Sequence, residues 1–230
     1  MDPVSIVVNP CDQLKKMIDP TNTTNIKAQI DWLKSKVNAL VNNKESGVEV
    51  QKRMNADETF RYEYTRIDSP NEFSVGLSTG GMNIGGMHSH PKKGYAMFSF
   101  QDVRFLLNAY DGASSTRSDD VFVMVVCKDN NGVTNTYNLK IDNIDALRNN
   151  VNSVWNDPFY SKFTKEDDKI KAIHMDQAKI YAKSNGELEK SFLDQFKDFG
   201  ISLYKADATT SSFSKLALNN LKTVTSTPCN

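Results

Sequence analysis

The chain carries the stretch Gly85-Gly86-Met87-His88-Ser89-His90-Pro91, followed after seven residues by Ser99-Phe100-Gln101-Asp102. If His88 and His90 lie on a strand, their side chains project from the same face, and both imidazoles can reach one ion. Pro91 would then end the strand, because proline cannot donate to a strand ladder. The stretch therefore predicts a metal site at the end of a strand.

Ser99 and Asp102 supply the third part of this site. Ser99-x-x-Asp102 has the form of a capping box at a helix N-terminus, and apolar residues follow it at roughly helical spacing. Asp102 would lie in the first turn of that helix. Two neutral imidazoles and one carboxylate, with a fourth position left to water, form the ligand set of a catalytic zinc ion, whereas structural zinc usually has four protein ligands.

Together these residues match every position of the pattern HxHP-x7-SxxD: His88, His90, Pro91, Ser99 and Asp102. At these residues the chain resembles the JAMM (MPN-plus, JAB-like) family of zinc metalloproteases, and the resemblance covers roughly residues 26–142. It implies that His88, His90 and Asp102 hold one Zn²⁺. It also implies that Ser99 helps to bind the water or the developing oxyanion, and that an upstream glutamate moves protons.

The position of that glutamate has two candidates. Family members carry it as Glu-x-x-Gly, some forty-odd residues before the His-x-His. Glu45-Ser46-Gly47-Val48 fits this position, although its glycine comes one residue early. Glu49 is the alternative, because it alternates with Val48 and Val50 and would face away from them on a strand. We take Glu45 as the first candidate for the catalytic base.

The resemblance implies an enzyme, a JAMM-type metallopeptidase. We expect a peptidase or isopeptidase that hydrolyses an amide bond of a protein or peptide with a metal-activated water. Phe98 replaces the proline that many members carry before the motif serine, which affects the predicted groove and not the ligands. The alternative is a non-catalytic MPN-type binding or assembly module, for example within a bacterial or phage-type toxin or delivery system.

The composition limits which partners and which cellular compartment we expect. The 230 residues include 28 basic and 28 acidic side chains, which predicts no bulk attraction to nucleic acid or to an anionic membrane. No apolar run approaches the roughly twenty residues that span a bilayer. Residues 1–5 lack the basic region of a secretory signal, so we expect a cytoplasmic protein unless a specialised machine exports it. The oligomeric state stays open.

The three cysteines predict no disulfide framework, because Cys11, Cys127 and Cys229 are odd in number and widely separated. Cys127 follows the apolar run of residues 121–126, and we expect it to be a buried small hydrophobe.

We expect an α/β fold, in which a JAMM-like (cytidine-deaminase-like) mixed sheet is flanked by helices and followed by a C-terminal helical extension. The predicted segments are a lead-in at 1–24, the metalloprotease domain at 25–142, the helical extension at 143–205 and a loosely ordered tail at 206–230.

Local patterns predict the elements inside these segments. A helical stripe comprises Ile26, Ile30, Leu33, Val37 and Leu40. Strands are expected over residues 48–53, 60–67, 72–77 and 121–127, with a hairpin turn at Asn131-Gly132. Three helices are expected after residue 143. His174 lies in the second of these, and we expect it at a polar boundary and not as a third imidazole ligand.

Overall fold

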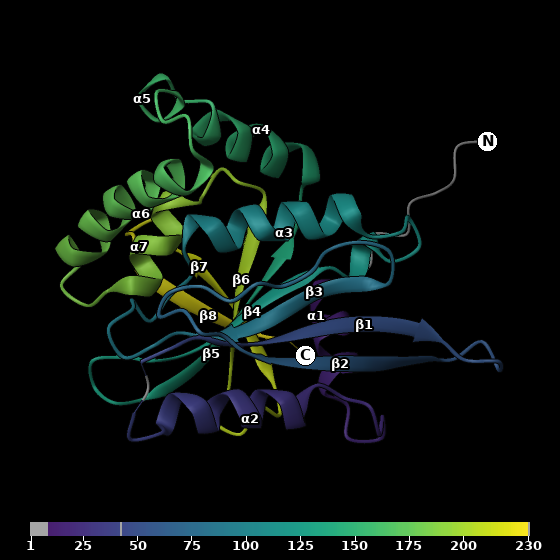
Figure 1. The fold of residues 1–230 in the computed structure, drawn as a ribbon. Coiled ribbons are helices and arrows are strands. Elements are labelled where there is room, and N and C mark those ends of the chain that lie inside the picture. The colour runs from purple at the N-terminus through teal and green to yellow at the C-terminus, as the bar shows by residue number, and fades with distance from the viewer. Residues whose placement is uncertain (1–8, 42, 230) are drawn as a thin grey trace.

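The structure is a computed structural model that describes residues 9–41 and 43–229. Eight strands form one sheet in the order β2-β1-β3-β4-β5-β6-β7-β8. Strands β3 and β4 are parallel, and the other neighbours in the sheet are antiparallel. Helix α2 covers one face, and α3, α4, α6 and α7 lie on the other side of the sheet (Figure 1). The predicted α/β class and the mixed sheet flanked by helices are confirmed.

The strands are β1 (Ser46–Met54), β2 (Phe60–Asp68), β3 (Asn83–Ser89), β4 (Phe122–Lys128), β5 (Thr134–Ile141), β6 (Ile201–Ala206), β7 (Phe213–Leu218) and β8 (Val224–Pro228). The helices are α1 (Pro10–Ile18), α2 (Lys27–Asn38), α3 (Phe100–Gly112), the short 3-10 helix η1 (Ser118–Asp120), α4 (Ile144–Trp155), α5 (Pro158–Ser161), α6 (Glu166–Lys183) and α7 (Leu188–Gln195). Most of the predicted strands and helices are found within a few residues of their expected positions.

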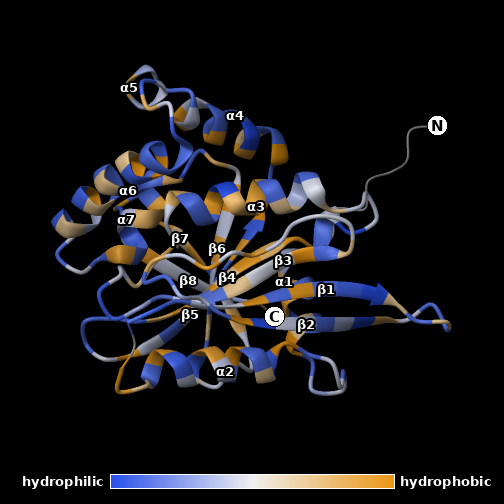
Figure 2. Ribbon diagram, in the orientation of Figure 1, coloured by the Kyte–Doolittle hydropathy of each residue, from blue (hydrophilic) through white to orange (hydrophobic). Residues whose placement is uncertain are grey.

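Strand β4 separates two apolar cores. Its residues Val123 and Val125 pack with the α3 side of the sheet, while Phe122 and Met124 pack with α1 and α2. Strands buried on both faces are continuously apolar, as this one is. Figure 2 shows the apolar colour on the central strands and on the sides of the helices that face them.

Helix α2 buries the predicted stripe of Ile30, Leu33 and Val37 against the sheet. Leu40 was expected to belong to this stripe, but it is fully exposed. The helix ends at Asn38, and Ala39 is already extended, so Leu40 no longer follows the helical period.

Strand β3 positions the predicted metal residues. It pairs with β1 and β4, and the crossover from β3 to the parallel strand β4 passes through α3. A Cβ atom at Gly85 would lie 1.8 Å from the carbonyl oxygen of Phe122, and Gly85 has a positive φ of 122°. Glycine is required there so that the two backbones can approach each other.

The predicted strand at 72–77 is wrong. Both edges of β1 are occupied, by β2 and by β3, so this segment cannot pair with β1. The segment forms no strand and lies over β1 at Gly47 instead. Val75 and Leu77 pack against Gly47, where an added Cβ atom would lie 2.8 Å from a Val75 methyl carbon.

The predicted character of two segments, the lead-in and the tail, is also wrong. Residues 10–18 form α1, which buries Leu14 and Met17 in the core and is not a detached lead-in. Residues 213–228 form β7 and β8, which continue the same sheet, so the tail is ordered. The expected helical extension also contains a sheet strand, β6. The first eight residues of the predicted lead-in lie outside the described residues.

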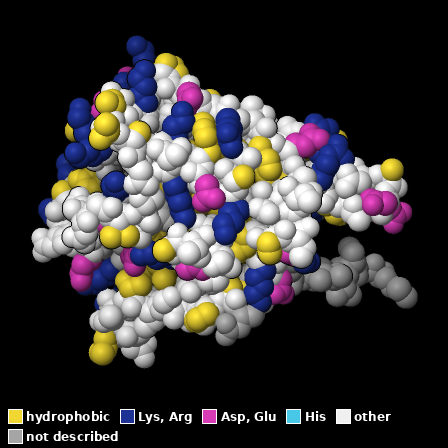
Figure 3. All heavy atoms as spheres, turned by 90° about the horizontal axis from the view of Figure 1, so that it is seen from below, with side chains coloured by type: hydrophobic (Ala, Val, Ile, Leu, Met, Phe, Trp, Pro, Cys, Tyr) yellow, Lys and Arg dark blue, Asp and Glu magenta, His cyan; other side chains and the backbone are white. Residues whose placement is uncertain are grey.

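Charged side chains of both signs share the surface. Figure 3 shows Lys and Arg side chains interspersed with Asp and Glu on the face seen from below, in line with the balanced composition. Among the described residues, no helix is both long and apolar enough to cross a bilayer.

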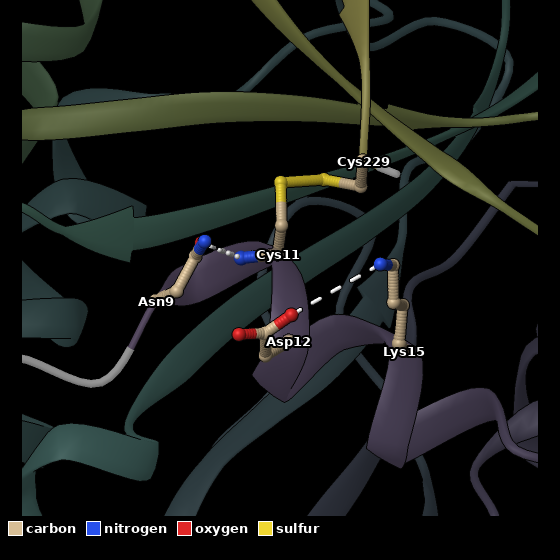
Figure 4. Close-up of a disulfide and its surroundings, with 5 residues drawn as sticks. All are labelled: Asn9, Cys11, Asp12, Lys15 and Cys229. Carbon is tan, nitrogen blue, oxygen red and sulfur yellow. Dashed lines mark hydrogen bonds and ion pairs between the residues drawn. A yellow bond between two sulfur atoms is a disulfide. The ribbon is translucent and has the colours of Figure 1, made fainter.

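A disulfide joins Cys11 in α1 to Cys229 after β8, which overturns the prediction of no disulfide (Figure 4). The two cysteines are 218 residues apart in sequence, and their Cα atoms are 5.1 Å apart. Only the tertiary fold brings them together, and the odd count leaves Cys127 as the buried free thiol, as predicted. Disulfides persist mainly in oxidising compartments. This bond is therefore more typical of an oxidising compartment than of the cytoplasm that the sequence predicted.

Candidate metal centre

His88 and His90 project from one face of the sheet, as the spacing predicted. His88 is in β3 opposite Val125, and the backbone N–H of His90 donates to the carbonyl of Val126 at 3.0 Å. The strand ladder thus continues one residue beyond β3, to the position before Pro91. The two Nε2 atoms are 3.1 Å apart.

Asp102 lies in the first turn of α3 and completes a cluster with the two histidines. Its Oδ1 is 3.2 Å from Nε2 of His88. One ligand atom from each of His88, His90 and Asp102 lies within 4.8 Å of the others, so the three residues could hold one metal ion. The predicted residues are therefore brought together by the parallel β3-α3-β4 crossover.

The protonation states of this triad suit a metal. Burial lowers the pKa of His88 to about 4, so its imidazole is neutral at neutral pH. Burial alone would raise the pKa of Asp102, but His88, His90 and hydrogen bonds from Ser99 outweigh it and hold that pKa below its usual value. Neutral imidazole and ionised carboxylate are the forms that bind metals.

A backbone carbonyl fixes the orientation of His90. Its Nδ1 lies 2.7 Å from the carbonyl oxygen of Tyr95, so this nitrogen carries the proton and donates it. The Nε2 lone pair is then directed toward His88 and Asp102. Such a hydrogen bond to the second ring nitrogen is the usual companion of a metal-binding histidine.

Ser99 is engaged with Asp102 and not with the centre of the site. Its Oγ donates to Oδ2 of Asp102 at 2.8 Å, and the backbone N–H of Ser99 donates to the same oxygen at 2.6 Å. The Oγ also accepts from the backbone N–H of Asp102, which completes the predicted capping box. This geometry gives Ser99 a role in orienting the carboxylate of Asp102. The hydroxyl proton of Ser99 is therefore not free for the predicted role of binding the water or the oxyanion.

Glu45 lies beside the triad. It directly precedes β1, and the backbone N–H of its neighbour Ser46 donates to Oγ of Ser89, between the two histidines, at 3.0 Å. Glu45 is only 8% exposed, and burial together with the charge of Asp102 raises its pKa to about 8. Glu49 instead accepts a hydrogen bond from the backbone N–H of Ser78 at 2.7 Å. The structure favours Glu45 of the two candidates.

Helix α6 holds the segment between His90 and Asp102, a contact that the sequence did not predict. Gln177 accepts from the backbone N–H of Phe100 at 2.8 Å, and Tyr181 donates to the carbonyl of Phe98 at 2.7 Å. The hydroxyl of Tyr95 donates to the carbonyl of Ala178 at 3.0 Å. A polar residue at 177 and an aromatic residue at 181, four positions apart on a helix, were the only signal in the sequence.

Compared with protein families, with curated proteins and with solved structures, the chain matches none of them.

Proposed function

We propose that the chain is a zinc-dependent peptidase or isopeptidase of the JAMM type, which hydrolyses an amide bond. The observation that carries this proposal is the convergence of one ligand atom each from His88, His90 and Asp102, with the buried carboxyl group of Glu45 beside them. Buried titratable groups with perturbed pKa values concentrate at functional sites.

The donor set fits zinc better than the hard cations. Two imidazole nitrogens and a single carboxylate are zinc ligands, whereas magnesium and calcium prefer oxygen ligands alone. When bound, zinc would lower the pKa of a water molecule and polarise the carbonyl group of the substrate. Three protein ligands leave a position open, which is the arrangement of catalytic sites.

Glu45 would move the proton in both halves of the reaction. The positive charge of a bound zinc ion would favour the ionised form of Glu45. As the oxygen of water forms a bond to the amide carbon, the carboxylate of Glu45 accepts a proton from that water, and the electron pair of the carbonyl bond moves to the carbonyl oxygen. Glu45 then gives this proton to the amide nitrogen while the carbon–nitrogen bond breaks. The products are a carboxylic acid and an amine, and Glu45 is regenerated as a carboxylate.

A non-catalytic binding module remains the competing proposal. It would need the metal ligands but no proton carrier, and the burial of Glu45 next to Asp102 argues against it. A protein or peptide substrate, and membership of a toxin or delivery system, are expectations from the sequence that this site does not address.

The test has two parts. Zinc titration of the wild-type protein and of H88A should show one tight site in the first and a large loss of affinity in the second. Wild-type protein should cleave members of a mixed peptide and isopeptide library, and a chelator should stop the cleavage until zinc is restored. Tight zinc binding without any cleavage would favour the binding module, and equal zinc binding by H88A would place the metal elsewhere.

A further inference from the structure

An amide hydrolase needs a hydrogen-bond donor for the carbonyl oxygen, which becomes an oxyanion as water adds. Such donors are worth about 10²–10³-fold in kcat when they are preorganised. Ser99 was the expected donor, but its hydroxyl proton is directed to Asp102. The site as proposed above therefore calls for a donor from another element.

Helix α6 directs a stripe of residues at the segment that joins the metal ligands. His174, Gln177, Ala178 and Tyr181 are spaced at i, i+3, i+4 and i+7, so they share one face of the helix. The last three all contact residues 95–100 through hydrogen bonds. His174, one turn toward the helix N-terminus, is thus presented on the face that meets the site.

The imidazole of His174 lies close to the site without belonging to the ligand cluster. It interacts electrostatically with Asp102 and His90, but it is not among the residues whose ligand atoms lie within 4.8 Å of one another. Its Nε2 is inaccessible to solvent and has no hydrogen-bond partner among the described residues. A buried polar atom without a partner destabilises a folded protein, so such an atom calls for an explanation.

We propose that His174 supplies the missing donor: its imidazole rotates out of its enclosed position, and its Nε2–H group binds the oxyanion that forms on the carbonyl oxygen of the substrate. This inference rests on the proposed amide hydrolysis. Burial lowers the pKa of His174, which favours a neutral ring, and a neutral imidazole can carry its proton on Nε2. His174 keeps this proton throughout, because the electron pair returns to the carbonyl bond as the carbon–nitrogen bond breaks. Glu45 alone transfers a proton.

The experiment uses acetohydroxamate, a small zinc-binding anion, as a probe that needs no knowledge of the substrate. Zinc affinity and acetohydroxamate affinity are measured by calorimetry for the wild-type protein, H174M and H174Q. Methionine fills the space without a donor, whereas the side-chain amide of glutamine can donate from a similar place. M175A, at an exposed neighbouring position of α6, controls for changes in the helix.

We expect zinc affinity to be the same in all four proteins. Acetohydroxamate should bind H174M about 10–100-fold more weakly than wild type, as for the loss of a hydrogen bond to a charged group. H174Q should recover most of this loss, and M175A should show none. The same order is expected for kcat on any substrate found in the library.

The outcomes separate the two proposals. Equal acetohydroxamate affinity in the wild-type protein and H174M, with zinc bound, would overturn the role of His174 and leave the proposed function intact. A loss in H174Q as large as in H174M would also overturn it, because packing and not donation would then be at work. A wild-type protein that binds no zinc would remove the proposed function and this inference together.

Discussion

Ser99 and Asp102 form a pair that stabilises the start of α3 and would also serve the proposed metal site. The capping box satisfies backbone groups at the start of α3 and at the same time holds the carboxylate of Asp102 in place. Both functions use the same two oxygen atoms of the pair, Oγ and Oδ2. Stability and metal affinity should therefore change together when Ser99 is replaced.

S99A should lower zinc affinity about 10–100-fold, because removal of a residue that orients a ligand has effects of this size. It should also lower the free energy of unfolding by about 1 kcal/mol through loss of the N-cap. N143A, which removes the N-cap of α4, is the matched control. It should cost similar stability in a denaturant titration and leave zinc affinity unchanged. Equal zinc affinity in S99A and wild type would contradict this account of Ser99.

E45Q should abolish turnover while zinc remains bound. Loss of a general base costs about 10²–10⁴-fold in kcat, and Glu45 is not one of the ligands in the cluster. E49Q is the control, because Glu49 is engaged with the backbone of Ser78. Cleavage rates and zinc titrations of the two variants decide between the candidates. Full activity of E45Q with a loss in E49Q would reverse the assignment.

At the scale of elements, the sequence did not predict that α6 holds residues 95–100. Its helical character was predictable from residues 165–171, and the burial of Gln177 was not, because burial depends on where the helix docks. The backbone N–H of Phe100, at the N-terminus of α3, has no partner within its own helix and donates to the side-chain oxygen of Gln177. A helix N-terminus leaves its first N–H groups without partners inside the helix, and α6 supplies an acceptor for one of these groups in α3.

Q177A should destabilise the protein and weaken zinc binding. The backbone N–H of Phe100 would lose its partner, at a cost of about 1–3 kcal/mol, and the adjacent ligand Asp102 would be held less firmly. K179A removes an exposed ion pair of the same helix with Asp176 and should change stability by less than about 1 kcal/mol. Denaturant unfolding with and without zinc measures both effects. If the two variants behave alike, α6 has no role in holding the site.

Strand β5 buries a lysine, which predicts a pH effect on stability. Lys140 donates to the carbonyl of Asp119, and burial lowers its pKa to about 7 despite the nearby charges of Asp119 and Asp120, with Lys52 adding to the decrease. Between pH 7 and about 10 the unfolded chain keeps the proton and the folded protein does not. Folded protein is therefore stabilised as the pH rises through this range.

We expect the wild-type protein to gain stability relative to K140M as the pH rises from about 7, by up to about 1.4 kcal/mol per pH unit. The difference between the two proteins cancels the titration of groups that they share. Urea unfolding at pH 6, 7, 8 and 9 measures it. A difference that stays constant over this range would show that Lys140 keeps its proton in the folded protein.

At the scale of the whole molecule, the sheet unites segments from both ends of the chain. The antiparallel strands β6, β7 and β8 extend it beyond β5, and α1 packs against the opposite core from the metal site. The Cys11–Cys229 disulfide links these two ends. A cross-link that closes so long a loop restricts the unfolded chain strongly.

Reduction, or the double substitution C11S/C229S, should lower the free energy of unfolding by about 2–5 kcal/mol. Zinc affinity should stay the same, because His88 lies on the α3 side of the sheet and α1 on the other. Mass spectrometry before and after reduction and alkylation counts the free thiols, and thermal unfolding reports the stability. Three free thiols in protein kept under oxidising conditions would contradict the pairing.

The sequence by itself determined the local features of this protein. The order of most elements, the shared face of His88 and His90, and the capping box of Ser99 and Asp102 follow from spacing, because residues within a few positions of one another on a strand or helix have a known relative direction. These predictions agree with the structure.

Only the tertiary structure decided the features that join distant segments. The folded chain was needed to prefer Glu45 to Glu49 and to place α6 over the site. It was also needed to assign the tail to the sheet and to pair Cys11 with Cys229. Such contacts depend on which sheet edges and apolar faces remain free when the other elements have packed. That competition is a property of the whole molecule, and no local spacing records it.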